Sequence, residues 1–280
     1  MYGFQLIQGP IFAHMNLAQD TQGNLIAYYQ HGKGDLPLVL IHGFCEDSSI
    51  WEPILTHLFA IPVICIDLPG FGKSAKASEP SMSIYSDAIK AVLDQTQTKR
   101  CVLVGHSMGG YAALEFVATY PEQLIGLGLF HSHPFTDQEE RKIARKRGIE
   151  TVMAGKRDLY VTQLFPNLFA PEFQIRQPQI IQTLTEQGKR QSAVAITNAL
   201  QAMLNRRDHQ ETLTRLSCPA LFLLGKKDTL IPYKDGLIAG LLPNISEIQV
   251  LDEIGHMGMW EAAEECGGIL DSFWHFCINK

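Results

Sequence analysis

The stretch VLVGHSMGGYAAL at residues 102–114 decides the fold of this 280-residue chain. An apolar, strand-like run ends in GHSMGG (105–110), and apolar residues then continue at helical spacing. The match to G-x-S-x-G, with a strand before it and a helix after it, predicts a sharp turn that exposes Ser107 as a nucleophile. Glycines on either side of the serine relieve the crowding of such a turn. The alternative is a glycine-rich connection that carries no chemistry.

A serine hydroxyl is a poor nucleophile until a base accepts its proton, so a base is expected downstream. His256 in LDEIGHMGMWE follows the last expected strand and is our candidate. Asp228 in LFLLGKKDTLIP directly follows a buried strand, so its carboxylate is expected at the same edge of the sheet, where it can orient the imidazole. The chain order Ser107, Asp228, His256 therefore predicts a catalytic triad.

Two backbone N–H groups are expected to stabilise the oxyanion of this chemistry. One belongs to Met108, at the start of the helix after the nucleophile. The other belongs to Phe44 in LIHGFCEDSSIW, with Cys45, one residue later, as the alternative. We expect His42 to shape this turn and His106 to pack beneath the nucleophile.

The substrate pocket is expected to be apolar, which suits an aliphatic or aromatic acyl group. Most apolar residues of the segment 132–206 are expected to pack against the core, and the remainder to face the pocket. The expected lining residues are Cys45, His131, Phe165, Met203, Met257 and Trp260.

Short apolar runs alternate with longer segments of helical period, which predicts an α/β fold with a mostly parallel central sheet and flanking helices. A leading antiparallel hairpin is expected to end in the strand 25–30. The other expected strands are 37–43, 62–70, 101–107, 124–130, 219–225 and 247–253, and the helices are 49–59, 82–97, 108–119, 233–241 and 258–276. The alternation stops between 132 and 206, which we interpret as a helical cap (lid) inserted into a core formed by 1–131 and 207–280.

Composition and charge restrict the partners. The formal net charge is -6, which argues against a nucleic-acid partner, and we interpret the basic cluster 141–147 as a solvated helix face. No apolar run approaches the roughly 18 residues of a membrane span, and the N-terminus resembles no secretory signal. The six cysteines form no CxxC pair, which favours a reduced, cytoplasmic protein without a metal site. The oligomeric state stays open.

The motifs taken together resemble the α/β-hydrolase fold superfamily, in its group of small lidded carboxylesterase-like enzymes. The matching pieces are His42-Gly43-Phe44, DLPGFGKS (67–74), GHSMGG (105–110), GKKDTLIP (225–232) and GHMGMWE (255–261). The resemblance implies the α/β-hydrolase fold over roughly 1–131 and 207–280, with Ser107 as nucleophile, His256 as general base and acid, and Asp228 as its partner. It also implies that DLPGFGKS has a structural role.

Relatives with this fold that attack an alkyl carbon carry aspartate at the nucleophile position, so serine favours acyl chemistry. We therefore expect hydrolysis of a small-molecule carboxylic ester or thioester through an acyl-enzyme, with no metal or organic cofactor. One alternative is the same triad used for carbon–carbon bond hydrolysis or hydroxynitrile lyase-type chemistry. Another is a non-catalytic protein that uses the pocket as a receptor.

Overall fold

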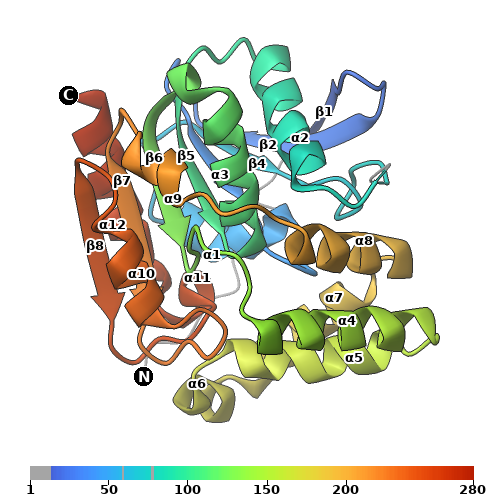
Figure 1. The fold of residues 1–280 in the computed structure, drawn as a ribbon. Helices are drawn as coiled ribbons and strands as arrows, with labels where there is room; N and C mark the ends of the chain where they lie inside the picture. Colours follow the sequence, from blue (N-terminus) through green and yellow to red (C-terminus); the bar gives the residue numbers. More distant parts are fainter. Residues whose placement is uncertain (1–13, 59, 77–78) are drawn as a thin grey trace.

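The computed structural model describes residues 14–58, 60–76 and 79–280, and a central β-sheet runs through them (Figure 1). The strands of the sheet lie in the order β1-β2-β4-β3-β5-β6-β7-β8. Their bounds are β1 Met15–Gln19, β2 Leu25–His31, β3 Leu38–Ile41, β4 Val63–Ile66, β5 Cys101–His106, β6 Leu124–Phe130, β7 Ala220–Gly225 and β8 Ser246–Leu251. The hairpin β1–β2 is antiparallel and β2 is antiparallel to β4, whereas all other neighbours are parallel.

The central strands β3, β4, β5 and β7 are buried at every position, because helices cover both faces of the sheet. The helices α2 (Met82–Gln95) and α3 (Met108–Thr119) pack against each other, and α1 (Glu52–Leu55) packs against α12 (Ala263–Ile278). Gly126 of β6 lets α12 approach closely, since a Cβ there would lie 2.5 Å from the sulfur of Cys277. The continuous apolar runs of the sequence are therefore the strands of one doubly covered sheet.

A helical insertion separates β6 from β7. It contains α4 (Glu139–Met153), α5 (Arg157–Leu164), the 3-10 turn η3 (Phe165–Leu168), α6 (Pro171–Arg176), α7 (Pro178–Lys189) and α8 (Ala193–Leu204). The helix α4 packs against α8, and α5 packs against α7. Figure 1 shows these helices gathered beyond one edge of the sheet. Residues 131–219, all of which the structure describes, contain no strand, as the lost alternation predicts.

The remaining short elements are η1 (Ser48–Trp51), η2 (Pro121–Gln123), α9 (Gln210–Thr214), α10 (Tyr233–Ala239) and α11 (Gly258–Glu261). Within the described ranges, no helix is both long and apolar enough to cross a membrane.

Some expected elements are shorter than predicted. The strand expected at 62–70 ends at Ile66, because the carboxylate of Asp67 then accepts the backbone N–H groups of Ser48 and Lys73, each at 2.8 Å, and closes a turn. The helix expected at 258–276 is divided into α11 and α12 at Ala262, whose φ of -146° and ψ of 57° are not helical. The turn that Asp67 closes lies in the motif DLPGFGKS and is a structural role of the kind that the resemblance implies.

The parallel strands bring distant parts of the sequence to one edge. Because their carboxyl ends point the same way, the loops after β3, β5, β6, β7 and β8 meet where open α/β sheets bind their ligands.

Candidate active site

Ser107 occupies a strained turn between β5 and α3. Its φ of 49° and ψ of -114° lie in a region that residues with a side chain rarely adopt. Its N–H donates to the carbonyl of Phe130 at 3.0 Å, and the hydroxyl of Ser132 donates to the carbonyl of Ser107 at 2.9 Å. A Cβ on Gly109 would lie 2.5 Å from the carbonyl oxygen of His42, so the following turn requires glycine. The surrounding structure thus holds Ser107 in a backbone conformation that is otherwise unfavourable for a residue with a side chain.

The loops after β7 and β8 bring Asp228 and His256 together. Nδ1 of His256 donates to Oδ2 of Asp228 at 2.7 Å, and both side chains are buried. The other carboxylate oxygen accepts the N–H groups of Leu230 and Ile231 at 2.8 and 2.9 Å. Burial alone would raise the pKa of Asp228, but the facing charge of His256, the nearby His131 and the hydrogen bond from His256 hold that pKa well below its usual range.

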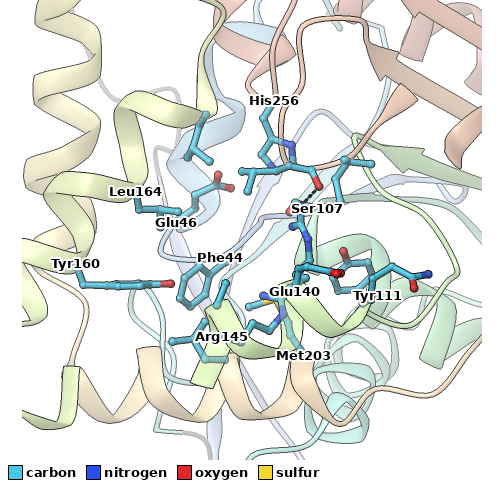
Figure 2. Close-up of a pocket in the computed structure, with 17 residues that line it drawn as sticks. Phe44, Glu46, Ser107, Tyr111, Glu140, Arg145, Tyr160, Leu164, Met203 and His256 are labelled. Carbon is cyan, nitrogen blue, oxygen red and sulfur yellow. Dashed lines mark hydrogen bonds between the residues drawn. The ribbon is translucent and has the colours of Figure 1, made fainter. Parts of the chain in front are cut away.

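Because Nδ1 of His256 carries the ring proton, Nε2 is free to accept a proton from a neighbouring group. His256 and Ser107 line the same cavity, and Figure 2 shows the imidazole next to the serine on one side of it. The backbone of the base is also held, since the N–H of His256 donates to the carbonyl of Leu168 in the insertion at 2.7 Å. The arrangement is that of a base beside a hydroxyl, with a carboxylate that fixes the tautomer of the base.

His131 lies beneath this pair rather than in the cavity. It follows β6 with a φ of 48° and is fully buried. Its Nδ1 accepts the N–H of Gly225 at 3.2 Å, so the 3.6 Å between Nδ1 and Oδ2 of Asp228 is a contact without a shared proton. Burial, opposed by Asp228, lowers the pKa of His131 to about 4, and the ring is therefore neutral near pH 7.

The donor atoms of His131, Asp228 and His256 lie within 4.8 Å of one another, which is close enough for a metal site. The atoms that face one another already take part in hydrogen bonds, however. Each carboxylate oxygen of Asp228 and the Nδ1 of His131 accept the hydrogen bonds described above. The observed contacts among these residues are those of a hydrogen-bonded acid–base pair, with His131 beside it.

The turn after β3 places Phe44 beside the cavity. His42 shapes this turn, because its Nδ1 donates to the carbonyl of Gly43 at 2.8 Å while its Nε2 accepts the N–H of Leu68 at 2.9 Å. Phe44 lines the cavity, and Met108 is the first residue of α3, so its N–H has no acceptor within the helix.

The cavity has a volume of about 570 Å³. The helices α4, α5 and α8 of the insertion form much of its wall, and most of the lining is apolar or aromatic (Figure 2). Besides Ser107 and His256, the lining residues are Phe44, Glu46, Tyr111, Gln138, Glu140, Arg141, Ala144, Arg145, Tyr160, Leu164, Leu168, Leu200, Met203, Leu230 and Ile231.

Some of the expected pocket residues line the catalytic cavity and others do not. Met203 lies in the wall of the cavity. Cys45, which has a left-handed φ of 63°, and Phe165 instead border a separate small cavity. Met257 is fully buried and Trp260 packs against the core, so neither is among the described lining residues.

Several lining residues are not among those expected from the sequence. Arg141, Ala144 and Arg145 are spaced at i, i+3 and i+4 on α4, a pattern that places them on one helix face. That face borders the cavity. The interpretation of the basic cluster as solvated therefore holds for the exposed Lys146 and Arg147, but is wrong for Arg141 and Arg145.

The chain matches the model of the α/β hydrolase fold family over residues 37–263 and belongs to that family. It is 30% identical over 250 residues to the pimeloyl-[acyl-carrier protein] methyl ester esterase of Citrobacter koseri, covering 83% of this chain and 91% of the relative. It is 28% identical over 269 residues to the 2-hydroxy-6-oxononadienedioate/2-hydroxy-6-oxononatrienedioate hydrolase of Burkholderia vietnamiensis, covering 90% of this chain and 91% of the relative.

Among solved structures, a thermophilic esterase from Thermogutta terrifontis superposes with a TM-score of 0.89 at 26% identity, covering 95% of this chain and 99% of the esterase. The expected fold and the expected membership of the superfamily are confirmed. The chain is a hydrolase of this family, as its relatives and its structural neighbour are.

Proposed function

We propose that this hydrolase cleaves a small carboxylic ester or thioester through an acyl-enzyme formed on Ser107. The observation that carries the proposal is the 2.7 Å hydrogen bond from His256 to Asp228, on a base that shares its cavity with a serine at a strained turn. A serine of this kind reacts only beside such an oriented base.

The reaction proceeds in two halves. In the first, Nε2 of His256 takes the hydroxyl proton while Oγ of Ser107 forms a bond to the acyl carbon. Collapse of the tetrahedral intermediate breaks the bond to the leaving alcohol or thiol, which receives the proton from His256. In the second, water attacks the acyl carbon and gives its proton to His256. The bond to Oγ of Ser107 then breaks, Oγ takes the proton back from His256, and the acid is released.

The backbone N–H groups of Phe44 and Met108 stabilise the oxyanion in both halves. What supports these positions is that Phe44 lines the cavity next to the nucleophile and that the N–H of Met108 lies at the start of α3. Removal of one such donor in other enzymes costs about 3 kcal/mol, which is the scale expected here.

The segment 132–206 acts in this proposal as a cap that selects the acyl group. Its support is that α4, α5 and α8 provide much of the wall of the cavity. The apolar part of the wall suits an aliphatic or aromatic acyl group. We further propose that the protein acts in the cytoplasm without a nucleic-acid or membrane partner, because its six cysteines are free and buried and its net charge is -6.

The test compares Ser107→Ala with Ser272→Ala, a substitution of an exposed serine on α12. We expect Ser107→Ala to lose hydrolysis of short p-nitrophenyl esters and labelling by a fluorophosphonate probe, whereas Ser272→Ala keeps both. Ester hydrolysis that survives unchanged in folded Ser107→Ala would refute the serine as nucleophile.

A second candidate is hydrolysis of a carbon–carbon bond with the same triad. It is favoured by the likeness to the 2-hydroxy-6-oxononadienedioate/2-hydroxy-6-oxononatrienedioate hydrolase over nine-tenths of both chains. Turnover of a vinylogous diketone that exceeds turnover of every ester in a panel of varied acyl length and leaving group would select this candidate.

A further inference from the structure

A buried ion pair connects two loops of the active site through the end of β5. Glu46 lies in the loop after β3, and its Oε2 accepts the N–H of Gly43 at 2.7 Å and Nδ1–H of His106 at 3.0 Å. The other ring nitrogen of His106, Nε2, donates to the backbone carbonyl of His256 at 3.0 Å. One imidazole at the end of β5 thus bridges the loop of the expected oxyanion hole and the loop of the base.

Both nitrogens of His106 face acceptors, so the geometry requires the imidazolium form, because a neutral imidazole donates only once. Burial lowers the pKa of His106, but the charge and hydrogen bond of Glu46 and the carbonyl of His256 raise it further, with a net rise. Burial raises the pKa of Glu46, but His106 and the N–H of Gly43 lower it further, with a net fall. Both directions favour the charged forms of the pair.

We propose that Glu46 and His106 are positioning residues, which set the N–H of Phe44 and the imidazole of His256 relative to Ser107. This inference rests on the proposed function.

The packing around the pair shows why it sets these positions. A Cβ on Gly43 would lie 2.7 Å from Nδ1 of His106 and 2.9 Å from Oε2 of Glu46, so the turn that leads to Phe44 is built directly against the pair. The ring of His106 also lies 4.8 Å from that of His256, centroid to centroid. A displacement of the pair therefore moves both loops.

Titratable groups and apolar rings surround the side chain of His106. The titratable groups that face it are Glu46, His256, His131 at 6.2 Å between ring centroids, and Asp228, and the apolar rings of Trp51 and Phe130 close the remaining sides. Within this environment, Glu46 is the anion that contacts the ring and keeps it charged.

The test is Glu46→Gln. The amide oxygen can still accept from Gly43, but it carries no charge, so burial lowers the pKa of His106 and the ring loses one of its two donors as pH rises. We expect kcat to fall about ten- to hundredfold, the scale of one hydrogen bond to a charged group, with a smaller change in KM. We also expect a new loss of kcat on the alkaline side that the wild-type profile lacks. His106→Gln should lower kcat similarly but without that pH dependence.

Glu115→Gln is the matched control. Glu115 on α3 pairs with His209 at 3.2 Å and is partly buried, but it does not border the catalytic cavity. Its substitution should change only the free energy of unfolding. An unchanged kcat and pH profile in folded Glu46→Gln would overturn the inference, as would a variant that changes only in stability.

A measurement on the wild-type enzyme covers the case in which neither variant folds. Nitrogen-15 spectra should show both ring nitrogens of His106 protonated at pH 7.5, and a neutral ring there would overturn the inference. Failure of the proposed function has a different signature, since wild-type Ser107 would then resist the fluorophosphonate probe whatever the state of His106.

Discussion

Glu261 holds His256 in place without contacting its side chain. The carboxylate of Glu261 accepts the N–H of Gly255 and the N–H of Met257, the two neighbours of the base in the chain, at 3.1 Å. It also accepts the N–H of Ala170 from the helical insertion at 2.9 Å. One carboxylate therefore fixes the loop of the base and joins it to the insertion.

Removal of this carboxylate is expected to affect both stability and rate. In Glu261→Ala, three backbone N–H groups lose their acceptor, which should cost about 2 kcal/mol or more in the free energy of unfolding. We expect kcat to fall at least about tenfold, because the base is no longer held near the serine. Urea unfolding and ester kinetics measure the two effects. Glu264→Ala, at an exposed position of α12, is the control, and equal kcat values in the two variants would contradict this role.

Asp228→Asn should separate orientation of the base from the other parts of the site. The amide removes the charge and can present an N–H to Nδ1, which favours the wrong tautomer of His256. The corresponding change in a serine protease lowers kcat about 10⁴-fold, and we expect a loss of that order here. Asp252→Asn, which removes an exposed ion pair with Lys226, should leave kcat unchanged. Comparable activity of both variants would exclude Asp228 from the triad.

His133 makes the protein sensitive to acid. Burial and the charge of Arg206 lower the pKa of His133 to about 3, and its Nδ1 accepts the N–H of Phe135 at 3.1 Å. The unfolded chain binds this proton near pH 6.5, so stability is lost as pH falls from about 6.5 toward 3. The contribution between pH 7 and pH 5 is about 2 kcal/mol.

His133→Asn tests this linkage, since the amide oxygen can accept from Phe135 but does not titrate. The drop in unfolding free energy between pH 7 and pH 5, measured with urea, should be smaller in the variant by about 2 kcal/mol. An identical pH dependence in the two proteins would show that His133 is not the group responsible.

The cysteines are expected to be inert in the native enzyme. All six are free and buried, and burial, with Glu46 second, raises the pKa of the Cys45 thiol well above its usual range. A thiol must ionise to react, so an aromatic disulfide reagent should report few thiols until urea unfolds the chain. Fast modification of Cys45 in the native state would contradict its placement away from the catalytic cavity.

The order of the core elements, and the placement of Ser107, Asp228 and His256 at one edge of the sheet, could be predicted because each depends on a local pattern. Asp228 and His256 lie in the loops after β7 and β8, and the parallel strands of a covered sheet bring such loops to one edge. The pair that the sequence did not reveal depends on register instead. Glu46 and His106 are 60 residues apart, and they meet because Ile41 of β3 lies opposite Gly105 of β5.

The lining of the cavity was less predictable, because it depends on how helices pack and where single side chains point. The position of Cys45 beside Phe44 predicts that it lines the pocket, but its side chain borders another cavity. Arg141 and Arg145 were interpreted as solvated from charge alone, whereas α4 packs on α8 and brings them to the wall. Helical spacing predicts that Arg141 and Arg145 share one face of α4, but only the packing of α4 shows that this face borders the cavity.

The hydrogen bond from the N–H of His256 to the carbonyl of Leu168 joins the helical insertion to the backbone of the base. A displacement of η3 would break this bond. The position of the imidazole therefore depends on the packing of the insertion as well as on the loop that carries His256.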